Sequence, residues 1–319
     1  MLCGEQRTDV SLFVGRSSAI LWPVGEGSSR GRGGVMTTLK KIGIVGCGQM
    51  GSGIAQLGAQ AGYDILVSDL SDELLARGLR GIRDSLERGV AKGTVLRHDL
   101  EDVLGRIRTT TSVQDFSDCD MVIEAIVENI DEKKKLFSTL DNVCPPHTIL
   151  ASNSSCLSIT DMAMATQRSE KVVGMHFFNP VVVMTLLEVV VTILVSDDTF
   201  ETVKAFGESL GKSVIVARDE PGYIVNRLMA PFILDAIRLL ENGVASREDI
   251  DSSMVLGCNH PMGPLRLADF IGLDTVLYIS ESMYEEYKDR KYAPPLTLKR
   301  MVTAGHLGRK SGKGFYEYK

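Results

Sequence analysis

Several features that would point to particular classes of protein are missing from this sequence. Its six cysteines lie apart with no Cys-x-x-Cys pair, which indicates reduced thiols in a cytosolic type of compartment. The five histidines show no metal-ligand spacing, so we expect no metal site. The formal net charge is −6 and like charges form no block, which argues against nucleic acid as the main partner.

Apolar runs long enough to cross a bilayer are also missing. The run Val181–Val195 is too short and contains Glu188. We therefore expect no membrane partner and a cytoplasmic protein. The remaining composition is ordinary for a globular protein, with 44% hydrophobic and 24% charged residues. A chain of 319 residues is long for one compact core, which favours two domains.

Residues 1–38 differ in composition from the rest of the chain. They are rich in Gly, Ser and Arg, hold the only tryptophan, and show no clear periodicity. A transit peptide is basic and poor in acids, whereas here four arginines accompany Glu5, Asp9 and Glu26. We expect a disordered N-terminal extension, or translation from an upstream start with Met36 as the natural start.

From Lys40 onward, short apolar runs alternate with helical patterns. The runs are rich in β-branched residues and predict strands, and the patterns between them predict helices. This alternation predicts an α/β fold with a doubly wound Rossmann-type sheet, parallel at least in its first part. The expected strands are 40–46, 64–69, 120–126, 147–153, 172–178, 186–191 and 213–219, and the expected helices are 50–62, 71–91, 99–104, 131–142 and 199–210.

After Asp219 the strand pattern stops and only helical patterns remain. Ser246 followed by acidic residues is typical of a capped helix start. We therefore expect a sheet domain at 39–219 and an all-helical C-terminal domain at 220–319. The expected helices of the second domain are 223–242, 246–257, one or two within 264–289, and 295–304.

The stretch GCGQMG, which begins at Gly46, has the G-x-G-x-x-G spacing of a dinucleotide-binding turn. Gly46 permits the tight turn, Gly48 lets the backbone approach a pyrophosphate, and Gly51 allows close helix–strand packing. Asp69 ends the next strand 18 residues beyond Gly51 and could bind the adenosine ribose while repelling a 2′-phosphate, which favours NAD over NADP. Alternatively, the glycines form only a strand–helix turn and Asp69 caps the next helix.

Glu188 is the one acidic residue in the mostly apolar stretch from His176 to Val195. A buried carboxylate is costly without a partner, and His176 lies 12 residues earlier at the end of a predicted strand. Paired with Glu188, His176 would have a fixed tautomer and a free ring nitrogen to act as general base. Alternatively, His176 is a satisfied core histidine and Glu188 an edge-strand carboxylate in water.

Seven motifs in order make the chain resemble the L-3-hydroxyacyl-CoA dehydrogenases, especially the short-chain 3-hydroxybutyryl-CoA dehydrogenases of bacteria. The resemblance covers about residues 39–319. It implies NAD-dependent oxidation of (S)-3-hydroxyacyl-CoA to 3-ketoacyl-CoA, the reverse reduction of acetoacetyl-CoA, and a homodimer formed by the helical domain, which would also contact the substrate. The motifs are GCGQMGSGIA, IEAIVEN, ASNSSCLSIT, GMHFFNP, EPGYIVNRL, HPMGPL and LGRKSGKGFYEY.

The resemblance implies a role for each of four candidate catalytic residues. His176 matches the family's general base, and Glu188 matches the carboxylate that orients it. Ser155 matches a serine that hydrogen-bonds the substrate oxygen near the nicotinamide. Asn226 matches an asparagine that holds the substrate near the histidine. Without the resemblance, Ser155 would be interpreted as a turn hydroxyl and Asn226 as a helix-surface amide.

The resemblance also implies further binding residues. Ser85 and Lys92 match contacts to the CoA part of the substrate. For Lys133, Lys310 and Lys92 the alternative is a solvated surface charge. Besides the three glycines and Asp69, the expected NAD contacts are Gln49, Met50, Glu128, Lys133, Ser155, Asn179 and Lys310.

The chain departs from the family pattern after the histidine. The family usually reads NPxPVMKLVEV, whereas this chain has Val182 in place of a proline and Thr185 in place of a lysine. Losing the proline is expected to loosen the turn between His176 and Glu188. Two other functions remain open: a related sugar-acid dehydrogenase of the gulonate type, which shares the fold with the lambda-crystallins, and a non-catalytic cofactor-binding scaffold.

Overall fold

The computed structural model of the chain describes residues 39–318, so the expected disordered extension at residues 1–38 lies outside the described part. Eight strands form one sheet in the order β3-β2-β1-β4-β5-β6-β7-β8. Neighbouring strands are parallel except β6 and β7, which are antiparallel. The strands are β1 (Lys41–Val45), β2 (Asp64–Ser68), β3 (Ile107–Thr110), β4 (Met121–Glu124), β5 (Ile149–Ser152), β6 (Val172–Phe177), β7 (Leu186–Val191) and β8 (Ser213–Arg218).

Strand β3 and a short helix, α5 (Ile159–Ala163), are additions to the predicted elements. β3 has the sequence IRTT, and only Ile107 is buried because the strand lies at the edge of the sheet. A four-residue polar edge strand has too little apolar periodicity to be recognised in the sequence. All seven predicted strands are present, and the predicted doubly wound fold is confirmed.

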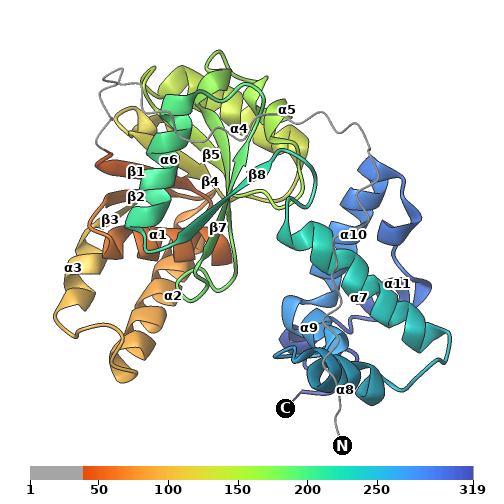
Figure 1. The fold of residues 1–319 in the computed structure, drawn as a ribbon. Coiled ribbons are helices and arrows are strands. Elements are labelled where there is room, and N and C mark those ends of the chain that lie inside the picture. Colours follow the sequence, from red (N-terminus) through yellow and green to blue (C-terminus); the bar gives the residue numbers. More distant parts are fainter. Residues whose placement is uncertain (1–38, 319) are drawn as a thin grey trace, which may run out of the picture. The chain divides into compact units, whose positions relative to one another are not determined.

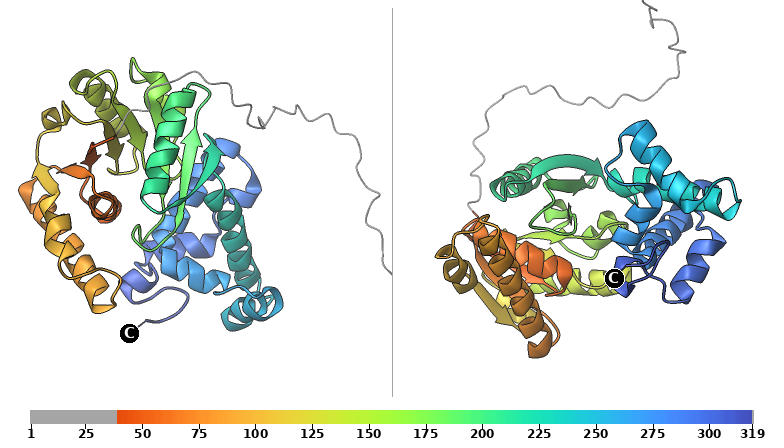
Figure 2. Two further views of the ribbon diagram at one scale, coloured as in Figure 1. Left: turned by 60° about the vertical axis from the view of Figure 1, so that its left-hand side comes forward. Right: turned by 90° about the horizontal axis from the view of Figure 1, so that it is seen from below.

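Two sets of helices cover the two faces of the sheet (Figure 1 and Figure 2). One apolar cluster joins the sheet to the first set, and a second cluster joins the opposite face to α4 and α5. Such double coverage explains why the central strands are apolar on both faces. The first set is α1 (Gln49–Gln60), α2 (Asp72–Ala91), α3 (Asp99–Gly105) and α6 (Asp197–Ser209); the second contains α4 (Ile130–Val143).

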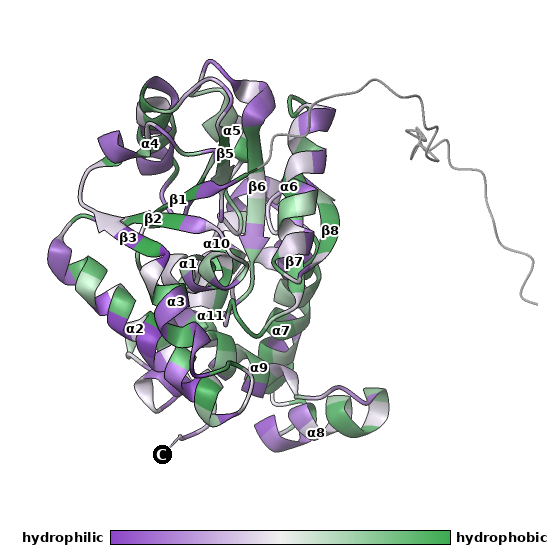
Figure 3. Ribbon diagram, turned by 90° about the vertical axis from the view of Figure 1, so that its left-hand side faces the viewer, coloured by the Kyte–Doolittle hydropathy of each residue, from purple (hydrophilic) through white to green (hydrophobic). Residues whose placement is uncertain are grey.

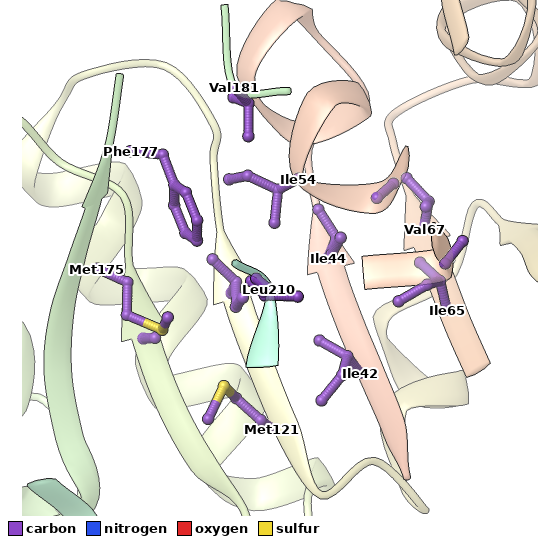
Figure 4. Close-up of a cluster of buried hydrophobic side chains, with 14 of the residues drawn as sticks. Ile42, Ile44, Ile54, Ile65, Val67, Met121, Met175, Phe177, Val181 and Leu210 are labelled. Carbon is purple, nitrogen blue, oxygen red and sulfur yellow. The ribbon is translucent and has the colours of Figure 1, made fainter. Parts of the chain in front are cut away.

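The first cluster anchors the segment that follows β6. Phe177 and Val181 lie in the same cluster as Ile54 of α1 and Ile44 of β1 (Figure 4). A Cβ atom added at Gly53 would lie 2.9 Å from Val181, so this glycine lets α1 approach the loop closely. The loop after His176 is therefore packed against the helix that follows the glycine-rich turn.

Helix α2 illustrates how the sequence determines which face is buried. Its buried residues Leu75, Gly78, Ile82 and Leu86 recur every three or four positions, which matches the helical repeat. The other positions are mostly polar, and the ribbon of α2 alternates between hydrophobic and hydrophilic colours in Figure 3. The Ser71 hydroxyl accepts a hydrogen bond from the Leu74 N–H and caps the helix start.

The second region is all helical, as predicted. The expected pattern over 264–289 is divided in two by Gly272, which has φ +104°. An apolar cluster of its own joins these helices and includes Ile233, Leu265 and Phe315. The helices are α7 (Val225–Glu241), α8 (Arg247–Cys258), α9 (Pro264–Ile271), α10 (Leu273–Tyr287) and α11 (Leu296–Thr303), and short 3-10 turns lie at Val113–Phe116, Ser169–Lys171, Arg290–Tyr292 and Arg309–Ser311.

The glycines of the last motif allow the C-terminal segment to pack on a buried carboxylate. Asp269 accepts hydrogen bonds from the N–H groups of Phe315 and Tyr316 at 2.9 Å each. A Cβ atom at Gly308 would lie 2.3 Å from the Asp269 carbonyl oxygen, and one at Gly314 would lie 2.0 Å from its carboxylate. Larger residues at these two positions would displace the segment from Asp269.

Within residues 39–318, none of the helices combines the length and the apolar character that crossing a bilayer requires.

Candidate active site

The glycine-rich turn has the geometry that its spacing predicts. Gly46 has φ +100°, and a Cβ atom there would lie 2.5 Å from the Ala125 carbonyl oxygen. A Cβ atom at Gly51 would lie 1.8 Å from the Gly46 carbonyl oxygen, so this glycine is needed for helix–strand packing. At Gly48 an added Cβ would meet no described protein atom within 4 Å. Packing thus explains Gly46 and Gly51, whereas Gly48 leaves room for a ligand.

The N-terminus of α1 lies at this turn and has no side-chain cap. Gly48 occupies the N-cap position and offers no hydroxyl or carboxylate to the first-turn N–H groups. Free N–H groups and the positive end of the helix dipole attract anions such as phosphate. The residues present therefore fit the pyrophosphate of a dinucleotide.

Asp69 lies at the carboxyl end of β2 and faces the glycine-rich turn. Its carboxylate accepts hydrogen bonds from the Cys47 N–H at 2.8 Å and from the Leu70 N–H at 2.7 Å. The N-cap of α2 is Ser71, so the alternative in which Asp69 caps that helix is wrong.

His176 and Glu188 are directly opposite each other on antiparallel strands β6 and β7. His176 Nδ1 lies 2.7 Å from Glu188 Oε2. His176 is 4% exposed and Glu188 is fully buried, so the alternative of an edge-strand carboxylate in water is wrong. Because β6 runs parallel to β5 and β4, His176 lies near the same edge of the sheet as the ends of those strands.

The second oxygen of Glu188 binds the start of α7. Glu188 Oε1 accepts hydrogen bonds from the N–H groups of Ile224 at 3.2 Å and Val225 at 3.0 Å. An ionised carboxylate only accepts hydrogen bonds, so His176 Nδ1 carries the proton that it donates to Oε2. The other ring nitrogen, Nε2, is then free to accept a proton.

Ser155 completes this arrangement on the other side of the imidazole ring. Its Oγ lies 3.1 Å from His176 Nε2, and its N–H donates to Glu128 Oε1 at 3.0 Å. The hydroxyl therefore does more than close a turn, because it contacts the nitrogen that is free to accept a proton. A substrate hydroxyl near Ser155 would meet the same nitrogen.

A buried charged cluster supports the Ser155 turn. Lys133 Nζ lies 2.6 Å from Glu124 Oε1 and 3.0 Å from Glu128 Oε2. Lys133 is 1% exposed, so its interpretation as a solvated surface charge is wrong. Ser152 Oγ donates to Glu124 Oε2 at 2.6 Å. Sequence reasoning missed Glu124, although an acid that ends the buried strand MVIE is itself unusual.

Two family models of known proteins match the chain, one over the sheet region and one over the helical region. The family model described as "3-hydroxyacyl-CoA dehydrogenase, NAD binding domain" matches residues 41–220, and the model of the C-terminal domain of that family matches residues 222–318. This chain belongs to the 3-hydroxyacyl-CoA dehydrogenase family.

Relatives of known name agree with this assignment. A probable 3-hydroxybutyryl-CoA dehydrogenase of Deinococcus radiodurans is 50% identical over 278 residues, which cover 87% of this chain and 100% of the relative. The mitochondrial hydroxyacyl-coenzyme A dehydrogenase of Homo sapiens is 42% identical over 289 residues, covering 88% and 92%. The crystal structure of (S)-3-hydroxybutyryl-CoA dehydrogenase from Ralstonia eutropha has a TM-score of 0.84 at 44% identity, covering 88% and 100%.

Three further residues that the family resemblance singled out lie close to these groups or at the start of α7. Gln49 Nε2 donates to Asn179 Oδ1 at 3.1 Å, which joins the start of α1 to the loop after β6. Asn226 lies in the first turn of α7, next to Val225, whose N–H donates to Glu188. Asn226 is 5% exposed, so its interpretation as a helix-surface amide is wrong.

The remaining candidates lie outside the hydrogen-bond network of His176, Glu188 and Ser155. Met50 is partly buried in α1, and Lys310 forms an ion pair with Asp274 at the start of α10. Ser85 lies in α2 and Lys92 is the C-cap residue directly after that helix, where it is exposed. No contact joins these two residues to His176.

Tyr223 is a site residue that sequence reasoning missed. Its ring lies 5.4 Å from the His176 ring in an edge-on arrangement, and its hydroxyl donates to the Ser154 carbonyl oxygen at 3.1 Å. Burial, followed by nearby Asp219, raises the pKa of Tyr223 well above its ordinary value, so the hydroxyl keeps its proton. The tyrosine within EPGYIVNRL was visible in the sequence, but its contact with the histidine was not.

Cys156 follows Ser155 and could be taken for a nucleophile. Burial, with a smaller effect of nearby Glu128, raises the pKa of its thiol to about 12. A thiol with this pKa stays protonated at neutral pH and is a poor nucleophile.

Val182 and Thr185 lie in the loop between β6 and β7, where both are exposed. Lys212 Nζ donates to the carbonyl oxygens of Val181 and Met184 at 2.6 Å each and so ties the two ends of this loop segment together. The expected loosening of the turn by the loss of the proline stays a prediction. The two hydrogen bonds of Lys212 would oppose such loosening.

Proposed function

We propose that this chain oxidises the 3-hydroxyl of short-chain (S)-3-hydroxyacyl-CoA, such as 3-hydroxybutyryl-CoA, to the ketone with NAD, and reduces acetoacetyl-CoA in reverse. One observation carries the proposal. An imidazole, oriented by a buried carboxylate on one side, presents its free nitrogen to a serine hydroxyl on the other. The names of the relatives support the substrate class.

His176, Glu188 and Ser155 would move and hold the proton. His176 Nε2 takes the proton of the 3-hydroxyl as general base, and Ser155 Oγ donates to the substrate oxygen and fixes its position. Glu188 Oε2 holds the Nδ1–H and stabilises the imidazolium that forms. In the reverse direction, the protonated His176 donates to the ketone oxygen.

The turn of Gly46, Gly48 and Gly51, together with the uncapped start of α1, would hold the pyrophosphate of NAD. Asp69 would accept hydrogen bonds from the adenosine ribose hydroxyls. NAD, when bound, accepts the hydride from C3 of the substrate. The other proposed contacts on this side are Gln49, Met50, Glu128, Lys133, Ser155, Asn179 and Lys310.

The acyl-CoA substrate would meet residues of both regions. Asn226 would help to hold the substrate near His176, and Ser85 and Lys92 would contact the CoA part, where a cation suits phosphate. We place the domain boundary between residues 219 and 220, with NAD binding in 39–219 and substrate binding and dimerisation in 220–319. A homodimer in the cytoplasm is part of the proposal.

The test is NADH oxidation followed by absorbance, with acetoacetyl-CoA or a keto-sugar acid as substrate. We expect turnover with acetoacetyl-CoA only. His176→Gln should lower kcat at least about a hundredfold while NADH still binds, because the general base is lost. Near-normal turnover of His176→Gln would remove His176 from the base role.

The same assay separates the other two functions. Turnover with the keto-sugar acid alone would favour a dehydrogenase of the gulonate type. NADH binding without turnover of either compound would favour the scaffold.

A further inference from the structure

The turn that leads from β8 into α7 has an unusual backbone. Gly222 has φ +82° and Tyr223 has φ +46°, so two consecutive residues adopt the left-handed region. For a bulky residue this conformation is rare and strained. A tyrosine rather than a glycine at the second position suggests that its side chain is needed there.

The turn points the first N–H groups of α7 at the catalytic carboxylate. Ile224 is the N-cap of α7 and gives no side-chain cap, and the N–H groups of Ile224 and Val225 donate to Glu188 Oε1 instead. These two bonds hold the carboxylate whose other oxygen orients His176.

The side chain of Tyr223 reaches the other two members of the site. Its hydroxyl donates to the carbonyl oxygen of Ser154, the residue before Ser155. Its ring packs edge-on against the His176 ring and is 4% exposed. Tyr223 therefore contacts His176 through its ring and the turn before Ser155 through its hydroxyl. Its backbone leads directly into Ile224 and Val225, whose N–H groups donate to Glu188.

We propose that Tyr223 is the positioning residue of the catalytic pair. Its backbone aims the α7 N–H groups at Glu188, its ring fixes the plane of the imidazole, and its hydroxyl sets Ser155 against Nε2. The inference rests on the proposed function for the meaning of kcat, but the geometry can be tested without turnover.

The kinetic test compares three variants of the full chain. Tyr223→Phe keeps the ring and should lower kcat about fivefold, whereas Tyr223→Leu loses the ring too and should lower kcat about thirtyfold. The KM for NADH should stay unchanged in both, because the glycine-rich turn is untouched. Tyr287→Phe is the matched control, since its hydroxyl donates to the Pro221 carbonyl oxygen of the same turn at 3.2 Å. The control should keep the wild-type kcat.

A spectroscopic readout tests the position of the imidazole directly. The proton between His176 Nδ1 and Glu188 should give a low-field NMR resonance in the wild type and in Tyr287→Phe. It should shift or broaden in Tyr223→Phe and more strongly in Tyr223→Leu. If Tyr223→Leu does not fold, the Phe variant still carries the test.

The outcomes separate this inference from the proposed function. No turnover of acetoacetyl-CoA by the wild type would overturn the proposed function, and the resonance would still test the positioning role. Wild-type turnover together with unchanged kcat and an unchanged resonance in the Tyr223 variants would overturn the positioning role alone.

Discussion

Helices of the sheet region and helices of the C-terminal region begin in different ways. In the sheet region, α2, α4, α5 and α6 each have a cap from the residue just before the helix, although the first N–H groups of α5 also donate to the distant carboxylate of Asp219. In the C-terminal region, α7, α9 and α11 begin on carboxylates of other elements, although α8 has a local cap. The local caps are Ser71, Asn129, Ser158 and Ser196, and the distant carboxylates are Glu188, Asp251 and Glu241.

This difference shows which kinds of helix N-terminus can be recognised from a sequence. A local cap lies a few positions from its N–H partner, so it can be recognised in the sequence. A distant carboxylate satisfies the same N–H groups only after the chain has folded. In α7 this second arrangement also serves the candidate active site, because the capping acid is the one that orients His176.

Of the three caps compared below, the buried distant cap Asp251 should have the largest effect on stability when it is removed. Asp251 is 4% exposed and accepts hydrogen bonds from Leu265 N–H at 2.8 Å, Arg266 N–H at 3.1 Å and Tyr316 Oη at 2.8 Å. Asp251→Ala should lower the free energy of unfolding by about 3 kcal/mol, because buried donors lose a charged acceptor. Urea unfolding followed by circular dichroism measures it. Tyr316→Phe, which removes one donor, should cost less.

Removing a local cap should have a smaller effect. Ser71→Ala leaves the Leu74 N–H of α2 without its acceptor and should cost about 1 kcal/mol. Ser71→Asn restores an acceptor and serves as the control in the same urea experiment. A larger loss for Ser71→Ala than for Asp251→Ala would contradict the comparison.

Removing the exposed distant cap should have the smallest effect. Glu241 Oε1 accepts hydrogen bonds from the Thr297 N–H and hydroxyl at 2.9 Å each, but both residues are accessible to water. Glu241→Ala should cost about 0.5 kcal/mol, because water replaces the acceptor. Glu241→Gln is the control. A loss near that of Asp251→Ala would mean that distance along the chain, rather than burial, sets the value of a cap.

The sequence predicted the elements better than the contacts between them. Periodicity located every long helix, and the glycine spacing located the turn before α1. The lone acid in an apolar stretch led to the pairing of Glu188 with His176, which the structure places at 2.7 Å. These signals lie within single segments of the chain.

What the sequence did not reveal depends on the folded arrangement. Glu124 and Lys133 form a buried pair across two elements, and no local pattern joins them. Tyr223 contacts the His176 ring and a carbonyl 69 residues earlier, which only the folded chain brings near. Short polar elements such as β3 lack the apolar repeat by which strands are recognised.

The cross-strand register of β6 and β7 determines which residue lies opposite His176. Met175 pairs with Val189, and Phe177 pairs with Leu187. All four side chains are buried on the face of the sheet opposite to the one that carries His176 and Glu188. A slip of one strand by one residue would place His176 opposite Leu187 or Val189, so the apolar pairs on the other face of the sheet help to hold Glu188 opposite His176. The pairing of His176 with Glu188 is therefore set by the two strands and does not depend on the side chains of Val182 and Thr185 in the loop between them.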